Sequence, residues 1–205
     1  DPNKATVKRI LNSAFIDIDA VELKLPDTVE YIGENAFYTS ELSSLALPTS
    51  LKYIGDGAFR FWRLRTLELP ASLEYIGEDA FYFSHLGSLY LPTSIKYIGE
   101  DAFRCSELTS LDLPASLEYI GEGTFYFSEL SSLALPTSLK YIGDCAFHSS
   151  RLSTLELPDS LRVIGKDAFR LARLRALELP SSLEYIGKDA FNCSWITSLD
   201  LSNTL

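Results

Sequence analysis

The sequence predicts an α/β, mostly β solenoid, a coil in which each turn is one copy of a short repeat. Three observations predict this fold. Pro, Gly and Phe each recur with a period of 22 residues along most of the chain. A unit of this length is too short to enclose a core, so each unit must pack against the units before and after it. The apolar positions are also nearly constant from unit to unit, as the stacked layers of one continuous core require.

The repeat organises the chain as a single domain. Numbering the recurrent Pro as position 1 places Gly at position 8 and Phe at position 12, and eight complete units then occupy residues 26–201. Residues 1–25 hold a degenerate unit that keeps Ala14 and Phe15, and we expect it to cap the N-terminal end. Residues 202–205 begin a further unit. Because the sequence contains no Met, we expect it to be a piece of a longer protein.

Each unit is predicted to contain one turn region and one strand. We expect Gly at position 8 to adopt positive φ, and the acidic pair and Ala-Phe step after it to form one short helical turn. The Leu-rich end of the unit, such as Leu45-Ala46-Leu47, predicts a strand with positions 20 and 22 inward and positions 19 and 21 outward. The next Pro ends the strand because it has no N–H to donate. Parallel strands of successive units should lie about 4.8 Å apart.

Constant apolar columns define the predicted core. Position 7 is Ile and position 12 is Phe in every complete unit, while positions 4, 17, 20 and 22 are Leu with occasional Val or Ile. Position 6 is Tyr except at Val163. The apolar replacement at Val163 favours a partly buried Tyr ladder with its hydroxyls at the rim.

Two other columns alternate from unit to unit. Position 5 changes sign over the first six complete units, from Glu30 to Lys140, which predicts a ladder of exposed ion pairs. Position 13 alternates between Tyr and Arg or His from Tyr38 to His148, which permits cation–π stacking along the column. Residues 40–56 also recur identically as residues 128–144. Such identity implies either recent duplication or consensus design.

The unit L-P-x-S-L-x-x-I-G-x-x-A-F, which closes with L-x-x-L-x-L, resembles the BspA-like leucine-rich repeats of bacterial and protist surface proteins over residues 4–205. Two features depart from the family pattern: the units are one residue shorter, and Cys follows the Phe only at Cys105 and Cys193. The resemblance implies a right-handed leucine-rich-repeat coil, with a parallel sheet on the concave face and short helical turns or irregular segments on the convex side. It also implies an extracellular or cell-surface binding scaffold, and some family members adhere to host matrix proteins.

Composition excludes several classes of function. The net charge of −10 argues against a nucleic-acid surface, because neutralising phosphates needs a basic face. No stretch approaches the about 18 apolar residues of a membrane-spanning helix. We expect neither an enzyme nor a bound metal or cofactor, because His85 and His148 lie in different units and no Ser or Cys motif accompanies them. Three Cys are too few for a disulfide framework.

The first candidate binding surface is the outward row at position 21 of the predicted strand. Position 19 beside it is almost entirely Ser or Thr, so the row predicts an acidic, hydroxyl-lined concave face for a basic or sugar-bearing partner. The alternative is a solvated strand face whose charges keep the sheet edges soluble. The candidate ligand-binding residues of this row are Glu68, Tyr90, Asp112, Glu156, Glu178 and Asp200.

The second candidate surface combines arginines with large apolar side chains, which are enriched at binding hot spots. Trp62 replaces the Ser or Ala of most other units, so we expect it to contact a partner before any other residue. The alternative for Phe61 is a half-buried structural position. The candidates of this surface are Arg60, Phe61, Trp62, Arg63, Arg65, Arg173, Arg175 and Trp195.

The sequence therefore predicts a non-enzymatic binding module that recognises a protein or glycan through its variable faces, by adhesion at a cell surface. The alternative is a structural or self-associating repeat scaffold, consensus-like or engineered, with no dedicated ligand. Self-association is expected through the C-terminal end, which has no polar capping unit to cover the last core layer.

Overall fold

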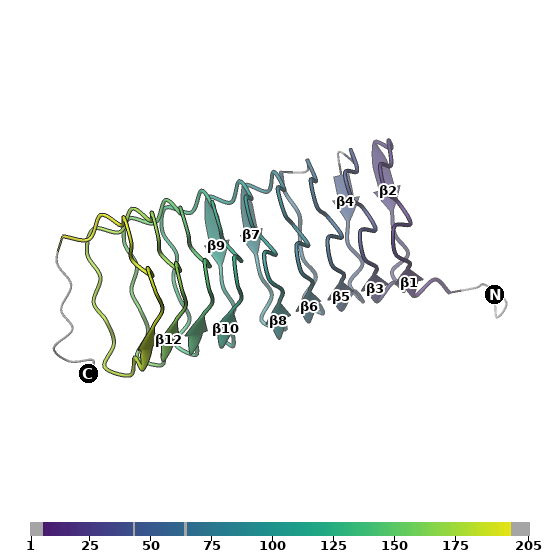
Figure 1. Ribbon diagram of the computed structural model, residues 1–205. Coiled ribbons are helices and arrows are strands. Elements are labelled where there is room, and N and C mark those ends of the chain that lie inside the picture. The colour runs from purple at the N-terminus through teal and green to yellow at the C-terminus, as the bar shows by residue number, and fades with distance from the viewer. Residues whose placement is uncertain (1–5, 43, 64, 198–205) are drawn as a thin grey trace.

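The computed structural model describes residues 6–42, 44–63 and 65–197, and it is an elongated coil in which each turn is one repeat unit (Figure 1). These ranges form thirteen short parallel strands and contain no helix. The predicted mostly β solenoid is therefore confirmed. The segments after the Gly at position 8 are hydrogen-bonded turns rather than helical turns.

One row of strands is formed by positions 6 and 7, the Tyr-Ile step, which the sequence predicts only as a rim ladder. Each strand pairs in parallel with its equivalent 22 residues away, as Tyr31 does with Tyr53. A five-stranded sheet contains β1 (Arg9–Ile10), β3 (Tyr31–Ile32), β5 (Tyr53–Ile54), β6 (Tyr75–Ile76) and β8 (Tyr97–Ile98). A four-stranded sheet contains β10 (Tyr119–Ile120), β11 (Tyr141–Ile142), β12 (Val163–Ile164) and β13 (Tyr185–Ile186).

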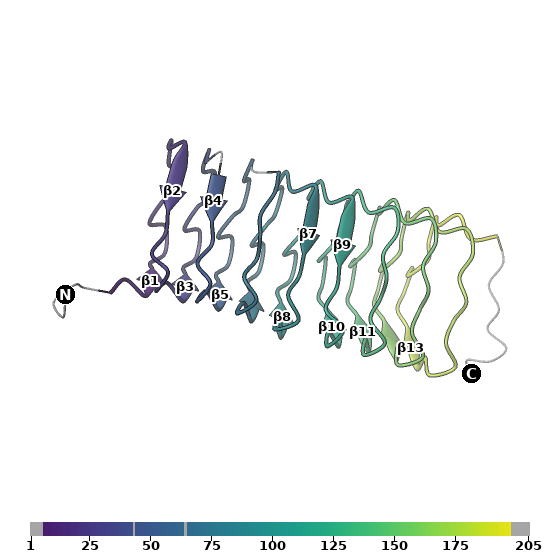
Figure 2. The same cartoon turned by 180° about the vertical axis from the view of Figure 1, so that it is seen from behind.

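The second row of strands is formed by positions 19 to 21, as predicted. It contains two parallel pairs: β2 (Glu22–Lys24) with β4 (Ser44–Ala46), and β7 (Ser88–Tyr90) with β9 (Ser110–Asp112). In β4, β7 and β9 the central Leu is buried and its two neighbours are exposed, which confirms the predicted alternation. The two rows run along opposite edges of the coil (Figures 1 and 2).

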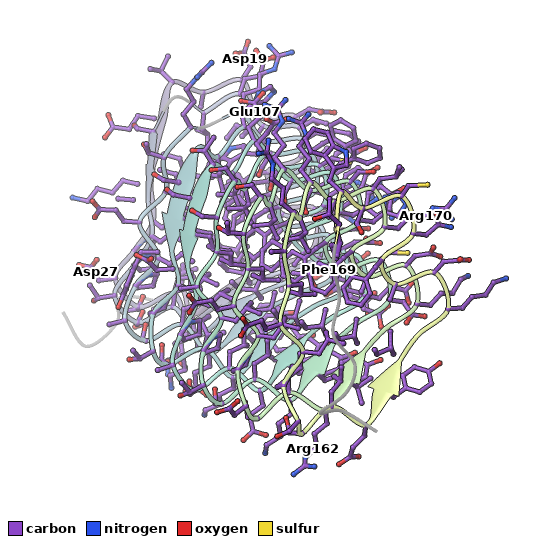
Figure 3. The ribbon with its side chains drawn as sticks, turned by 90° about the vertical axis from the view of Figure 1, so that its left-hand side faces the viewer. Asp19, Asp27, Glu107, Arg162, Phe169 and Arg170 are labelled. Atoms are coloured by element: carbon purple, nitrogen blue, oxygen red, sulfur yellow. The ribbon has the colours of Figure 1, made fainter. Side chains whose placement is uncertain are left out.

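The core is a stack of phenylalanine rings along the coil axis. Neighbouring rings from Phe15 to Phe191 lie parallel, with 5.3 to 5.8 Å between their centroids. Figure 3 shows Phe169 inside the coil, whereas Arg162 and Asp27 project outward. Burying each such ring contributes about 1.5–3 kcal/mol, so the Phe column is a major source of stability.

The turns use positive φ at positions 10 and 14, not at position 8, so the prediction for the position-8 glycines is wrong. Residues at position 10 such as Asn35 and Asp101 have φ of 51° and 52°. Gly99, at position 8, is needed for a different reason: a Cβ there would lie 2.5 Å from the backbone nitrogen of Glu78 in the preceding unit. Close stacking of backbones, rather than a left-handed turn, requires this glycine.

The alternating charges form the predicted contacts. Along position 5, Lys140 Nζ lies 2.8 Å from Glu118, and Lys96 pairs with Glu74. Exposed pairs of this kind contribute about 0–1 kcal/mol each. Along position 13, the Arg104 guanidinium lies 4.3 Å from the centre of the Tyr126 ring. Both columns therefore help to hold neighbouring units in register.

Candidate functional site

The row formed by positions 19 to 21, which we call the strand face, is hollowed at three places. The first hollow, of about 550 Å³, lies across residues 22–24, 44–47 and 66–68. The second, of about 340 Å³, lies across residues 66–68, 88–90 and 110–112. The third, of about 510 Å³, lies across residues 110–112, 132–135 and 154–156. Successive hollows share residues, so they form one continuous recessed surface.

Position 21 of the strand face carries three carboxylates in the hollows, whereas Lys24 occupies the equivalent place in the N-terminal unit and lines the first hollow. Glu68 lines the first two hollows and Asp112 the last two, while Glu156 lies in the third. Among residues 6–42, 44–63 and 65–197, no ion pair involves any of these three carboxylates. Tyr90 lies between Glu68 and Asp112 in the row and is 61% exposed. The face therefore presents negative charge around an accessible aromatic ring.

Hydroxyl groups line the same hollows at position 19. The residues that carry them are exposed, and within the part of the chain that the structure describes their side chains make no hydrogen bond: Thr66, Ser88, Ser110, Ser132 and Thr154. Buried leucines such as Leu67 and Leu89 lie between the exposed rows at position 20. The strand face thus offers both donors and acceptors over an apolar base. Glu178 is exposed at the next position of the row, and Asp200 lies outside the described residues.

The expectation that Trp62 contacts a partner is wrong, because its side chain is completely buried. Its ring packs 4.7 Å from that of Phe59, inside the coil. Position 15 is a column of small residues that points inward, as buried Ser84 and Ala172 show in other units. Trp62 departs from the small residues of its column because it fills space in the core, and not because it lies on the surface.

Phe61 is 37% exposed and belongs to a row of exposed apolar side chains at position 14. The other members of the row are not among the predicted binding residues, and they are 47–53% exposed: Phe83, Phe127 and Leu171. All four residues have φ between 53° and 59°, a conformation that bulky residues adopt at a cost. The signal available in the sequence was the variability of position 14, which a core column would not tolerate.

Some of the candidate arginines contact other side chains of the chain, and others are exposed. Arg60 pairs with Asp79 at 3.2 Å, and Arg63 pairs with Glu41 at 3.5 Å. The Arg173 guanidinium lies 5.8 Å from the centre of the Trp195 ring, which is 54% exposed. Arg65 and Arg175 are exposed. These residues extend along positions 13 to 18 of distant units, so the structure does not gather them into one pocket.

Histidine and cysteine, the usual side chains of acid–base and redox chemistry, number only two and three in the sequence. His85 Nδ1 lies 2.7 Å from Glu107, and both side chains are about half exposed. Burial raises the pKa of the Cys105 and Cys145 thiols, which keeps them protonated near neutral pH. Residues 6–42, 44–63 and 65–197 contain no group of three or more His, Cys, Asp or Glu able to hold a metal ion. They also contain no helix long and apolar enough to cross a membrane.

Comparison with known proteins identifies the repeat. The family described as BspA type leucine rich repeat region matches residues 3–108 and 96–205, in six copies. No curated protein matches the chain. Among solved structures, a leucine-rich repeat protein from Bacteroides ovatus is 28% identical with a TM-score of 0.69, over 94% of this chain and 58% of that one.

Two further solved structures share the fold. The pneumococcal vaccine antigen PcpA is 26% identical with a TM-score of 0.60, over 94% of this chain and 59% of that one. A leucine-rich cell surface protein from Faecalibacterium prausnitzii is 21% identical with a TM-score of 0.60, over 95% of this chain and 64% of that one. The chain thus spans about three fifths of these proteins, at 58% to 64% of their lengths. It belongs to the BspA type leucine-rich repeat family.

Proposed function

We propose that this chain is a non-enzymatic binding module that recognises a basic protein or glycan ligand through its strand face. One observation carries the proposal: within the described residues, three adjoining hollows present carboxylates without an ion pair and hydroxyls without a side-chain hydrogen bond on one repeat scaffold. Solenoids use such continuous recessed surfaces to bind extended partners.

The electrostatics of the strand face favour a basic ligand. Within the described residues Glu68, Asp112 and Glu156 form no ion pair, although Lys24 lines the first hollow with Glu68, and the chain as a whole carries a net charge of −10. A partner bearing Lys, Arg or amino-sugar groups would be attracted to the face at long range and could pair with the carboxylates at contact. The exposed Tyr90 ring would provide a surface for stacking of an apolar group or a sugar ring.

The proposed function includes a location at a cell surface. Family membership and the likeness to PcpA, a vaccine antigen, support an exposed location. Adhesion would follow if the ligand of the strand face belongs to another cell or to a matrix. The proposed alternative, a self-associating scaffold, depends on the C-terminal end, whose residues 198–205 lie outside the described ranges.

Selection from a random peptide display library tests the proposal. We expect the enriched peptides to be rich in Lys and Arg. Calorimetry should show that they bind the variant Glu68→Gln/Asp112→Asn at least about tenfold more weakly, since each hydrogen bond to a charged group is worth about 1.5–3 kcal/mol. The matched control is Glu118→Gln/Glu184→Gln, which removes two acids from position 5, directly before the strands of the other row. Equal loss in both variants would indicate general charge attraction, and unchanged binding in the first would remove the strand face from consideration.

A further inference from the structure

Two neighbouring units, which begin at Pro92 and Pro114, lack hydrogen bonds that join every other pair of units between Lys8 and Gly187. Elsewhere, N–H groups at positions 5, 6 and 8 donate to carbonyl groups of the preceding unit. Gly143 N, for example, donates to Ile120 O at 2.8 Å. Between β8 and β10 none of these hydrogen bonds is made, and this gap divides the Tyr-Ile row into two sheets along the lower edge of Figure 1.

Side-chain contacts are lost at the same place. In the next pair of units, Ser138 Oγ donates to Leu117 O at 2.7 Å, whereas Ser116 Oγ reaches only Thr93 O, at 3.4 Å. Tyrosine rings stack elsewhere in the row with 4.3 to 4.8 Å between centroids, but Tyr97 and Tyr119 form no stacked pair. A groove of about 500 Å³ occupies the opening, lined by residues 93–98 and by Ser116, Glu118 and Tyr119.

The opening is one-sided, because the turns of the same two units remain joined. Asp101 N donates to Glu122 O and Cys105 N to Tyr126 O, both at 2.8 Å. Phe103 N donates to the carbonyl of position 11 in the next unit at 3.0 Å. The turn side therefore keeps its hydrogen bonds while the Tyr-Ile side has lost them, which is the geometry of a pivot opposite an open edge.

Thr124 distinguishes this pair of units in the core. It stands in the buried column at position 11, where every other unit has Ala, and it adds a hydroxyl and a methyl group to close-packed layers. Its Oγ1 donates to Gly121 O in the same turn at 3.0 Å. The Phe103–Phe125 spacing of 5.8 Å is the widest in the described Phe column. A Cβ on Gly121 would meet the preceding unit only at 3.6 Å, against 2.6 Å for Gly143, so Gly121 is displaced from that unit.

We infer that Thr124 holds this edge open and that the opening is a hinge, at which the units before Pro114 and the units after it rotate about the turn side. Closing the hinge would form the missing backbone hydrogen bonds but would compress Thr124 against the Ala102 layer. These opposing terms make the open and closed arrangements close in free energy. The hinge gives a solenoid of otherwise uniform units a defined place at which its curvature changes.

Amide hydrogen exchange followed by NMR on the full chain tests the open edge. We expect the amides of Glu118, Tyr119 and Gly121 to exchange at least about 100-fold faster than those of Lys140, Tyr141 and Gly143, which keep their hydrogen bonds. Thr124→Ala should slow the first set at least about tenfold and leave the second unchanged. Relaxation dispersion at the Gly121 amide should be present in the wild type and absent in Thr124→Ala, because hinge motions occur on the microsecond to millisecond timescale.

A matched variant places Thr at position 11 of the next unit, where the sequence has Ala146. Ala146→Thr should accelerate exchange at Lys140, Tyr141 and Gly143, the amides of that unit. Equal protection of both sets in the wild type would overturn the open edge. Fast exchange that persists in Thr124→Ala would overturn the role of Thr124, and an absence of dispersion at Gly121 in the wild type would show a fixed opening and overturn the hinge.

Discussion

The indole ring of Trp62 packs against the ring of Phe59 inside the coil, with 4.7 Å between the ring centroids. We therefore expect Trp62→Ala to lower the free energy of unfolding by about 3–5 kcal/mol, the usual cost of removing a buried Trp. Urea unfolding followed by circular dichroism measures this loss. Phe61→Ser, one residue earlier but exposed, is the control and should cost less than half as much. Similar losses in the two variants would contradict the buried placement of Trp62.

The glycines at position 8 differ in the room that they leave for a side chain. A Cβ on Gly99 would lie 2.5 Å from a backbone nitrogen of the preceding unit. A Cβ on Gly121 would lie 3.2 Å from the side-chain Oγ1 of Thr124 in its own unit, and it would meet the preceding unit only at 3.6 Å. We expect Gly99→Ala to destabilise the chain by about 2 kcal/mol or more, as overpacking does, and Gly121→Ala by less than about 1 kcal/mol. Thermal unfolding of both variants gives the comparison, and an equal loss would show that the units at Gly121 are as close as the others.

Phe127 is 53% exposed and has φ of 56°, a conformation that Asn adopts at lower cost. We expect Phe127→Asn to raise the free energy of unfolding by about 0.5–1 kcal/mol through relief of this strain. Tyr126→Asn should act in the opposite direction, because the Tyr126 ring stacks on His148 with 4.6 Å between centroids. Chemical denaturation measures both. A loss of stability in Phe127→Asn would mean that the ring contributes more to packing than its conformation costs.

Glu100 should make stability depend on pH. Burial, and then the carboxylates of Glu122 and Glu78, raise the pKa of Glu100. A carboxyl group with a raised pKa in the folded state binds more protons when folded, so its stabilising contribution is present below its unfolded pKa and is lost as the pH rises through its folded pKa. Glu100→Gln should therefore raise the melting temperature at neutral pH, by the equivalent of about 0.5 kcal/mol or less, and should have little effect in acid.

The control for this pH dependence is Glu129→Gln. Glu129 lies 2.7 Å from Arg151, so its removal should lower the melting temperature slightly at neutral pH. Calorimetric scans of both variants across the acid range separate repulsion within the acidic column from attraction in an ion pair. A melting temperature of Glu100→Gln that follows the wild type at every pH would show that solvent screens the column completely.

The candidate site was only partly predictable from sequence. Alternation at positions 19 to 22 was sufficient to place Glu68, Tyr90 and Asp112 on an exposed strand face, because a strand directs successive side chains to opposite sides. The prediction for Trp62 failed because position 15 lies in an irregular segment with no such rule. Its direction follows from the turn conformation at Phe61, where φ is 58°.

The sequence by itself determined the solenoid, its period, its core columns and the family, because a repeat too short to enclose a core can only stack on its copies. The tertiary structure decided what depends on the distance and orientation between layers. Periodicity shows that Gly99 and Gly121 share a column, yet only packing shows that one is pressed against the preceding backbone and the other is displaced from it. The hollows of the strand face and the open edge at Tyr97 have the same origin, since the fit between adjacent units sets the space that remains between them.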